Sequence, residues 1–203
     1  MRGRKALTTV AAIATMLATT AFADPPETPP ASRAQGAFFG VNLGPRLPVG
    51  LFANQASIGG AMDLELSYTD TDFFPFFLYG RIGYRYFPGD QEYYQSTDHT
   101  HFSASYIPVQ LGIRSFFEPI TSEFFLLPVV EASGSAILYQ ELRQYDPLSG
   151  KADDNDEGIG YGFSIGVGAS MYVLEAVVIY EFFNGNQAAG FDLRARIPLY
   201  VSL

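Results

Sequence analysis

The chain has 203 residues, including 18 Phe and 13 Tyr but no Cys and no Trp. This length suits a single domain, and the aromatic content excludes a disordered chain. The formal charge is −9, so the chain lacks the basic footprint that nucleic-acid binding requires. Without Cys there is no disulfide framework, no thiolate chemistry and no Cys-based zinc site.

The first 23 residues have the layout of a secretory signal peptide. Three of the first five residues are basic, residues 6–20 are uncharged, and residues 21–23 form an A-x-A cleavage site. The uncharged stretch is too short and too rich in Ala and Thr for a stable membrane span, which disfavours the alternative of a retained anchor. We expect residues 1–23 to be removed. This removal takes away three basic groups and no acidic ones, and it moves the formal charge from −9 to −12.

The rest of the chain divides into a leader and one patterned domain. Residues 24–35 are rich in Pro and cannot pair in a sheet, so we interpret them as a short periplasmic leader. Residues 36–203 have a hydrophobic period of two and no run of 18 apolar residues, so we expect strands and no transmembrane helix. The predicted strands lie near residues 37–44, 60–69, 77–87, 103–116, 123–139, 159–172, 176–183 and 190–203.

The connections between these strands alternate in length. The first, third and fifth are long, at residues 45–59, 88–102 and 140–158. The second, fourth and sixth are short, at residues 70–72, 118–122 and 173–175, and the last, 184–189, is intermediate. Short turns at one end and long loops at the other are typical of transmembrane barrels, whose long loops are extracellular. The pattern predicts an all-β fold, an eight-stranded antiparallel up-and-down transmembrane β-barrel over residues 36–203.

Alternation alone also allows a soluble lipocalin-like barrel with its apolar face inward. The polar face of the strands, however, carries five acids and five bases. A narrow closed lumen needs such a balance, because an unpaired buried charge is costly, whereas a solvated surface does not. An eight-stranded barrel is wide enough only to be filled by side chains, which disfavours an anion pore. We predict a structural charge network in the lumen, made of Asp63, Glu65, Arg81, Arg85, Arg114, Glu131, Glu181, Asp192, Arg194 and Arg196.

Two further features favour the membrane barrel. The polar face of the strand near 159–172 contains only Gly and Ser, which leaves room in the lumen for long side chains from neighbouring strands. Aromatic residues gather near strand ends and short turns, as in the girdles at membrane interfaces.

The cleavable leader, the eight alternating strands and the Arg/acid lumen resemble the small outer-membrane β-barrel family of the OmpA membrane-domain and OmpX type. The resemblance covers essentially the whole mature chain and rests on architecture rather than on a motif. It implies a location in the outer membrane of a Gram-negative cell envelope, with outer-membrane lipids and lipopolysaccharide as partners. It also implies insertion by the barrel-assembly machinery, which reads the last strand. Here that strand ends in Leu203 rather than in the usual Phe or Trp.

One spacing suggests catalysis. His101 and Ser103 resemble the His/Ser pair of outer-membrane lipid A deacylases, with Glu131 or Glu141 as a possible third group. A three-residue spacing arises easily by chance, so we expect no enzyme activity and interpret these residues as part of a polar extracellular loop.

The sequence evidence for a metal site is equally weak. His99 and His101, with Asp90, Glu92 and Asp98, are a poor ligand set on a loop. The acidic run 153–158 mimics a calcium loop in part, but Ser164 stands where the bidentate Glu belongs. We predict no metal and no cofactor.

The sequence therefore predicts an outer-membrane barrel with a structural or surface-interaction role, a closed lumen and acidic extracellular loops. The alternatives are a lipid A-modifying hydrolase that uses His101 and Ser103, and a periplasmic lipocalin-like binder of apolar ligands. The sequence does not identify the partner of the loops.

Overall fold

The computed structural model describes residues 35–70, 72–73, 75–119, 126–171 and 173–202. The expected signal peptide and all but the last residue of the leader lie outside these described residues. Three short helical segments, η1 (Gly50–Asn54), α2 (Gln91–Ser96) and η2 (Pro147–Ser149), occur between strands. No helix among the described residues is long and apolar enough to cross a membrane. The strands are β1 (Gln35–Val49), β2 (Gly59–Thr69), β3 (Phe76–Pro88), β4 (His99–Phe116), β5 (Leu127–Tyr145), β6 (Asp154–Met171), β7 (Leu174–Phe183) and β8 (Asn186–Ser202).

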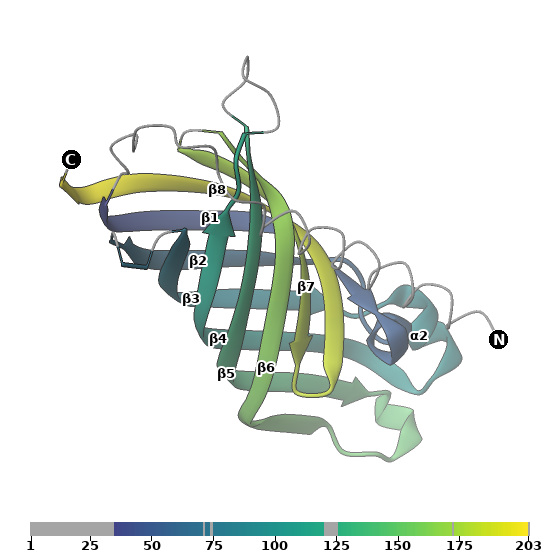
Figure 1. Ribbon diagram of the computed structural model, residues 1–203. Helices are drawn as coiled ribbons and strands as arrows, with labels where there is room; N and C mark the ends of the chain where they lie inside the picture. Colours follow the sequence, from purple (N-terminus) through teal and green to yellow (C-terminus); the bar gives the residue numbers. More distant parts are fainter. Residues whose placement is uncertain (1–34, 71, 74, 120–125, 172, 203) are drawn as a thin grey trace. The chain divides into compact units, whose positions relative to one another are not determined.

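The eight strands form a closed antiparallel barrel in sequence order, and β1 pairs with β8 to complete it (Figure 1). The predicted eight-stranded up-and-down barrel is therefore confirmed. One end of the barrel carries the β2–β3 turn, and we call it the turn end. The opposite end carries η1, α2 and η2, and we call it the loop end.

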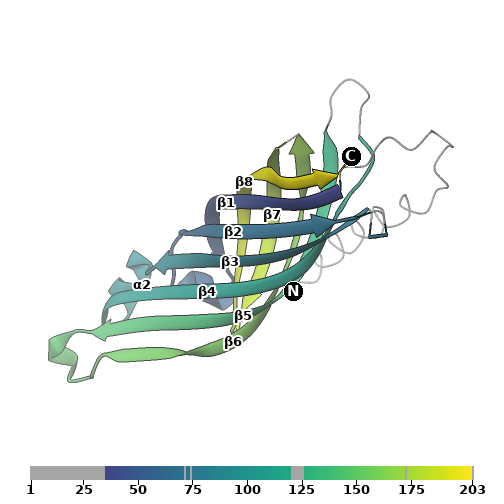
Figure 2. The ribbon, with the colours of Figure 1, turned by 90° about the vertical axis from the view of Figure 1, so that its left-hand side faces the viewer.

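The strands are longer at the loop end than the sequence pattern predicted. β4 begins at His99 rather than near residue 103, β5 continues to Tyr145, and β6 begins at Asp154. Most of the predicted long loop at 140–158 is therefore strand. These extensions are rich in polar residues on both faces, so they have no hydrophobic period to reveal them. Figure 2 shows β4, β5 and β6 extending past the other strands at this end.

The last connection also differs from the prediction. Residues 184–189 were expected to form an intermediate loop, but β8 begins at Asn186, and Asn184 and Gly185 make the turn alone. Both have positive φ, 47° and 88°. Asn-Gly is the pair that two-residue hairpin turns of this kind favour, because both central residues must adopt left-handed conformations.

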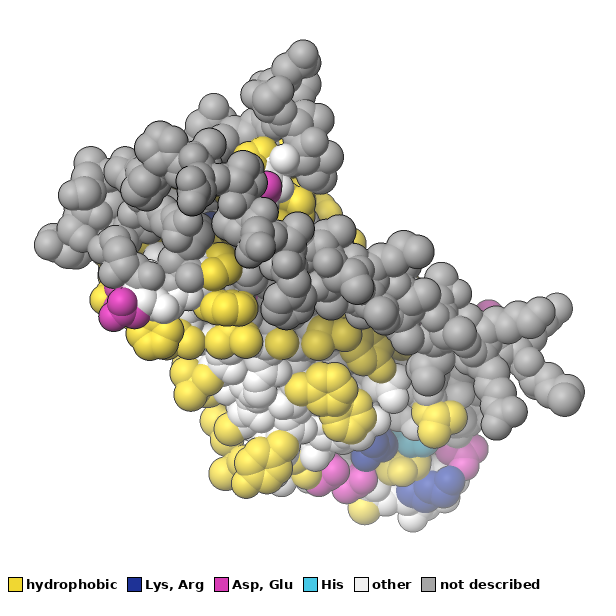
Figure 3. Space-filling view, in the orientation of Figure 1, with side chains coloured by type: hydrophobic (Ala, Val, Ile, Leu, Met, Phe, Trp, Pro, Cys, Tyr) yellow, Lys and Arg dark blue, Asp and Glu magenta, His cyan; other side chains and the backbone are white. Residues whose placement is uncertain are grey.

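The barrel has its apolar side chains outside and its charged side chains inside. On β2, Met62 and Leu64 are 53% and 48% exposed, whereas Asp63 and Glu65 are each 1% exposed. On the face coloured in Figure 3, apolar side chains cover the middle of the barrel and charged side chains gather towards its ends. A lipocalin-like barrel needs the opposite arrangement, so that alternative is wrong.

Candidate functional site

The lumen contains all ten of the charged residues predicted for it. Nine of them are at most 3% exposed, and the side chain of the tenth, Arg196, is 11% exposed. They come from β2, β3, β4, β5, β7 and β8, and the inward parity of each strand brings them together. The ion pairs centre on two places along the barrel, which the pair of Arg194 with Asp192 joins at 3.1 Å.

The first group centres on Glu65 and Glu131. Arg114 holds Glu65 with both terminal nitrogens, each at 2.8 Å. Arg194 holds Glu131 in the same forked way, at 2.5 and 2.7 Å. Arg81 donates to Glu65 at 2.7 Å and lies 3.5 Å from Glu131. Each carboxylate therefore accepts from more than one guanidinium, the arrangement that makes a buried charge tolerable.

The second group lies nearer the loop end and centres on Glu181. Arg85 donates to Glu181 at 2.7 Å and to Asp63 at 2.5 Å. Arg46 donates to Glu181 at 2.6 Å and contacts Asp192 at 2.6 Å. Some of these pairs join neighbouring strands, but Arg85 on β3 reaches Glu181 on β7, and Arg194 on β8 reaches Glu131 on β5, so the network also ties distant walls of the barrel to each other.

Sequence reasoning missed two members of the network. Arg46 was assigned to a loop and Glu175 to a turn, but both are buried strand residues, 0% and 2% exposed. Glu175 pairs with Arg196 and lies 3.7 Å from Arg114. With these additions the network has six acids and six bases. Arg46 lies four residues after Asn42, whose side chain points inward, so an unbroken strand predicts that Arg46 points inward too. Pro45, which lies between them, is a reason to end the predicted strand before Arg46. The signal for Glu175 was its parity with Glu181 on the same strand.

The small residues of β6 make room for this network. A Cβ atom built on Gly166 would lie 3.0 Å from Glu131 Cγ, closer than ordinary side-chain contacts. Ser164 is 1% exposed and shares a hydrogen bond of 2.7 Å with Ser133. The Gly/Ser face of β6 is therefore the wall against which the long side chains of the other strands lie.

An aromatic cluster closes the lumen at the loop end. Phe52, from η1, is 3% exposed and packs edge-on against Phe87 and Phe183, with centroid distances of 4.9 and 6.0 Å. Tyr106 packs beside them, 4.5 Å from Phe183, and donates to Glu141 at 2.8 Å. The sequence pattern predicts a loop at residue 52 and does not indicate that its side chain enters the barrel.

The candidate catalytic residues do not come together. His101 and Ser103 alternate along β4 with Phe102 and Ala104, which are both 0% exposed and point inward, so His101 and Ser103 are on the outer face. Glu131 and Glu141 are buried in the interior, at 2% and 7% exposure. Neither carboxylate can therefore orient the imidazole of His101 from inside the barrel wall, and the hydrogen bonds of the described residues include none between His101 and Ser103.

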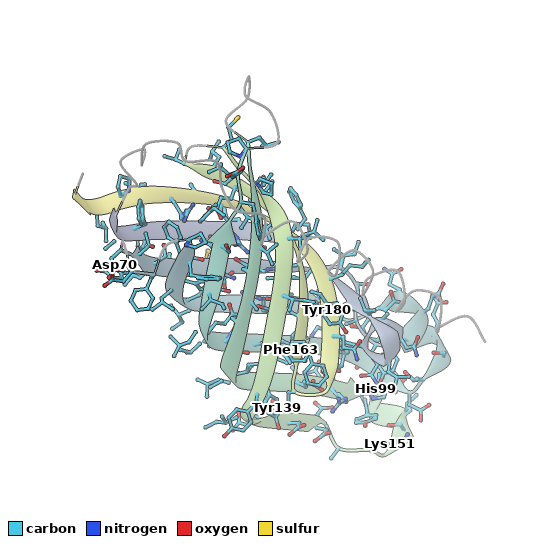
Figure 4. All side chains as sticks on the ribbon, in the orientation of Figure 1. Asp70, His99, Tyr139, Lys151, Phe163 and Tyr180 are labelled. Atoms are coloured by element: carbon cyan, nitrogen blue, oxygen red, sulfur yellow. The ribbon has the colours of Figure 1, made fainter. Side chains whose placement is uncertain are left out.

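Two of the residues considered as metal ligands, His99 and Asp98, have other partners. His99 lies between the rings of Tyr93 and Tyr145, and its ring nitrogens face Tyr93 Oη at 3.3 Å and Thr97 Oγ1 at 2.9 Å. Lys151 pairs with Asp98 at 2.8 Å. Figure 4 places His99 and Lys151 together at the loop end, far from Asp70 at the turn end. Among the described residues no group of three or more acidic or His side chains is placed to hold a metal ion.

The charges in this cluster shift its pKa values. The hydrogen bond from Lys151 lowers the pKa of Asp98, and the same bond raises the pKa of Lys151. Burial lowers the pKa of His99, and the positive charges of Arg143 and Lys151 lower it further. The cluster joins the β3–β4 connection to the β5–β6 connection, and a backbone hydrogen bond from Asp146 to Asp98 of 2.8 Å supports it.

The extensions of β4, β5 and β6 form a projecting sheet in which β6 is an edge strand. β6 pairs with β5 from Asp154 onwards, but its pairing with β7 begins only at Gly162. In the described part of the chain no strand pairs with the other side of β6 between Asp154 and Gly160. The acidic run 153–158, predicted as a loop, thus lies almost wholly on an edge strand, a geometry that cannot wrap around a calcium ion.

The outward apolar belt, the charged lumen and the closed antiparallel sheet of eight strands define a transmembrane β-barrel of the small outer-membrane type. The barrel accordingly lies in an outer membrane. The predicted resemblance is confirmed at the level of the fold.

Comparisons with known proteins agree with this class. A scan against protein-family models found no matching model, and a search of curated proteins found no match. The chain is similar to the solved structure of Ail, the attachment invasion locus protein of Yersinia pestis. That match has 10% identity and a TM-score of 0.50, and it covers 80% of this chain and 99% of that one.

Two further structures are similar at lower scores. Neisserial surface protein A has 15% identity and a TM-score of 0.47, with 83% of this chain and 100% of that chain covered. The outer membrane enzyme PagL has 15% identity and a TM-score of 0.45, with 80% and 99% covered. At these identities the likeness shows a shared fold and nothing about activity.

Proposed function

We propose that this protein is a surface-interaction barrel, in which the salt-bridged body is a rigid scaffold and the projecting sheet contacts a partner outside the cell. The observation that carries the proposal is the open edge of β6 from Asp154 to Gly160. An unpaired strand edge offers a row of backbone donors and acceptors, and an extended segment of a partner can pair with it as an added strand.

The charge of the projecting sheet limits the class of partner that can bind to it. Residues 143–157 contain five acids and two bases. Three of the acids, Asp154, Asp156 and Glu157, lie on the open edge itself and are exposed. Two copies of this edge repel each other, which disfavours self-pairing, whereas a basic strand is attracted. The partner class is therefore a basic extended peptide segment.

In this proposal the lumen network has a structural role. Its ion pairs join strands across the interior, and together with the aromatic cluster at the loop end they fill the space that a pore would need. Outer-membrane lipids and lipopolysaccharide surround the apolar belt, and the barrel-assembly machinery inserts the chain through its last strand. The sequence of the loops and of the projecting sheet can therefore change to suit the partner without disturbing the barrel.

Backbone geometry identifies a variant that tests the edge. The backbone N–H of Asn184 donates to the carbonyl of Tyr161, so the backbone groups of Tyr161 point to the open side of β6. Alternate residues along a strand point the same way, so those of Ile159 and Glu157 do too. Glu157→Pro removes a donor from the open edge and leaves the ladder with β5 intact. Ala152→Pro, in the connection before β6, is the matched control.

The experiment measures binding of a peptide of alternating Lys and Val to the folded full-length barrel in detergent. We expect binding to the wild type and to Ala152→Pro, and a severalfold loss in Glu157→Pro and in the triple variant Asp154→Lys/Asp156→Lys/Glu157→Lys. A peptide of alternating Glu and Val should not bind. Equal binding to Glu157→Pro and Ala152→Pro would overturn the proposal, as would stronger binding of the acidic peptide.

A further inference from the structure

The two edges of the projecting sheet differ in how far they are covered. At the β4 edge, the backbone N–H of Phe102 donates to Tyr94 Oη at 3.0 Å, and Tyr94 donates back to the Phe102 carbonyl at 3.1 Å. The backbone N–H of Gly89 donates to the same carbonyl at 2.9 Å. Tyr94 belongs to α2, so this helix lies where a further strand would pair with β4. Within the described chain, no such contact covers the backbone of β6 from Asp154 to Gly160.

The side chains along the open edge of β6 change from apolar to acidic. Near the β7–β8 turn, Ile159 and Tyr161 are on the outer face and are 70% and 77% exposed. Towards the tip of the β5–β6 hairpin, Asp154, Asp156 and Glu157 are exposed acids. The edge therefore has an apolar half beside the barrel and an acidic half beside the tip.

The inner face of the edge follows the same order. Gly158 and Gly160 point to this face and have no side chain to present. Tyr139 on β5, labelled in Figure 4, lies over Gly158, because a Cβ atom built on Gly158 would be 3.0 Å from Tyr139 Oη. Tyr139 also packs against the aromatic cluster at the loop end, so its ring is held beside the edge. A large apolar side chain of an added strand can cover an edge glycine, and opposite Gly158 it would meet this ring.

The acidic half contains two acids on adjacent strands. Asp156 lies directly opposite Glu141 on β5, and like charges in this position destabilise a sheet. Arg143 pairs with Glu141 at 2.6 Å and lies 3.6 Å from Asp154. The ion pairs of the described residues include none for Asp156 or Glu157. Basic side chains on an added strand would supply the missing compensation at these two positions.

The position of β7 determines the direction of the added strand. β7 is antiparallel to β6 and ends at Phe183, where the β7–β8 turn begins. A segment that pairs antiparallel with β6 continues the line of β7, so it begins beside Gly160 and ends beside Asp154. Antiparallel pairing is also slightly more stable per residue than parallel pairing.

We infer that the partner segment is apolar or aromatic in its first half and basic in its second half, and that it pairs antiparallel with β6. This inference rests on the proposed function of the edge and adds the order and the direction of the partner. The apolar half lies beside Ile159 and Tyr139. Two consecutive basic residues lie beside Glu157 and Asp156, one on each face of the sheet. The reverse order would place basic side chains against the apolar half and leave the acids without compensation.

Two peptides of the same composition, with blocked ends, test the order. The peptide Thr-Val-Tyr-Lys-Arg-Thr-Lys has the inferred order, and Lys-Thr-Arg-Lys-Tyr-Val-Thr has the reverse order. Binding is measured on the folded full-length barrel in detergent. We expect the first peptide to bind severalfold more tightly than the second. Ile159→Thr should weaken binding of the first peptide, and Ala152→Thr, in the connection before β6, is the matched control.

Disulfide trapping tests the direction, because the chain has no Cys of its own. The first peptide is made with an added Cys at its N-terminal or its C-terminal end. Residues 154 and 159 are roughly 17 Å apart along the strand, whereas a disulfide needs Cα atoms within about 7 Å. We expect Ile159→Cys to trap the N-terminal Cys and Asp154→Cys to trap the C-terminal Cys. Asp72→Cys, at the turn end, should trap neither.

The outcomes separate this inference from the proposed function. Equal binding of the two orders, or trapping at the opposite ends, would overturn the inference alone, provided that the peptide of alternating Lys and Val still binds and Glu157→Pro still weakens it. If neither of the two peptides nor the alternating peptide binds, the proposed function is wrong, and the inference is wrong with it.

Discussion

Arg46 on β1 and Glu181 on β7 are joined inside the barrel by a hydrogen bond of 2.6 Å from Arg46 Nε to Glu181 Oε2. β8 lies between these strands in the barrel wall, so the bond passes over the inner face of β8. Glu181 also accepts from Arg85 on β3, the strand opposite β7 in the barrel, so two guanidinium groups hold one carboxylate. The stability of the barrel therefore depends on charges that stay paired inside it.

The first prediction concerns this carboxylate. Glu181→Gln removes the negative charge and leaves Arg46 and Arg85 buried without full compensation, so the free energy of unfolding should fall by about 3–5 kcal/mol. Urea unfolding in lipid vesicles, followed by the gel mobility of the folded form, measures this change. Glu157→Gln on the exposed edge of β6 is the control and should stay within about 0.5 kcal/mol of the wild type. A Glu181→Gln variant as stable as this control would contradict a paired lumen.

A related prediction concerns coupling between the partners. Arg46→Met removes a buried charge that Glu181 and Asp192 neutralise, and alone it should also destabilise the barrel. In the double variant Arg46→Met/Glu181→Gln, the loss should be smaller than the sum of the two single losses, because each change removes the charge that the other leaves unpaired. A double-mutant cycle on the same unfolding assay measures the difference. Strict additivity would mean that the two side chains do not interact in the membrane.

Space in the lumen gives a third prediction. Gly166 lies against Glu131, and a Cβ atom there would be 3.0 Å from Glu131 Cγ and from Val177 Cγ1. Gly166→Val adds three carbons to this contact, so we expect a loss of about 1–3 kcal/mol from overpacking. The same substitution at Gly134, whose outward Cβ position is open, should cost less, and the unfolding assay compares the two. Equal losses of stability at both sites would show that position 166 does not need glycine to leave room for Glu131.

The sequence predicted the fold and the centre of the lumen because both depend on a period of two. Asp63 and Glu65 alternate with apolar neighbours in the middle of a strand, so their burial followed from parity. The errors lie where that period ends. Pro45 interrupts β1, and its pairing with β8 skips Gly44 and Pro45, so the strand was cut short before Arg46.

Other parts of the site depend on contacts between distant segments. Phe52 enters the lumen because η1 folds over the barrel mouth, and no local pattern in that connection specifies this. The β7–β8 turn, by contrast, is predictable from the sequence, because Asn184-Gly185 is a pair that strongly favours a two-residue hairpin turn. The longer loop expected at residues 184–189 does not take this pair into account. Likewise, the open edge of β6 depends on the unequal lengths of β6 and β7, which is a property of the assembled sheet.

The aromatic cluster leads to a prediction about permeability. Phe52→Ala removes a ring that packs against Phe87, Phe183 and Tyr106, and we expect the barrel to lose about 3 kcal/mol of stability. It should not conduct ions, because the ion pairs of Arg46, Arg85 and Glu181 still fill the lumen below the cluster. Planar-bilayer recordings test this, with wild type as the reference. Stepwise conductance in Phe52→Ala would mean that the ring, and not the charge network, is the barrier.

The final prediction concerns pH at the loop end. The pKa of His99 is lowered from 6.5, chiefly by burial and then by the charges of Arg143 and Lys151. A lowered pKa in the folded state means that the neutral imidazole is favoured there. Its contribution to stability is therefore fully present above pH 6.5 and is lost as the pH falls through the pKa of the folded protein. The stacking of Tyr93, His99 and Tyr145 should loosen over that acidic range.

Lys151 provides the variant that tests this account. Lys151→Met removes a positive charge near His99 and releases Asp98 from its ion pair, and both changes favour the imidazolium, so the pKa of His99 should rise towards 6.5. Lys151→Arg keeps the charge and should leave the titration unchanged. The imidazole resonance, followed by NMR in bicelles across this range, measures both effects. A titration that does not move in Lys151→Met would show that burial and the charge of Arg143 set the pKa of His99, and that the Asp98–Lys151 pair does not act on the cluster.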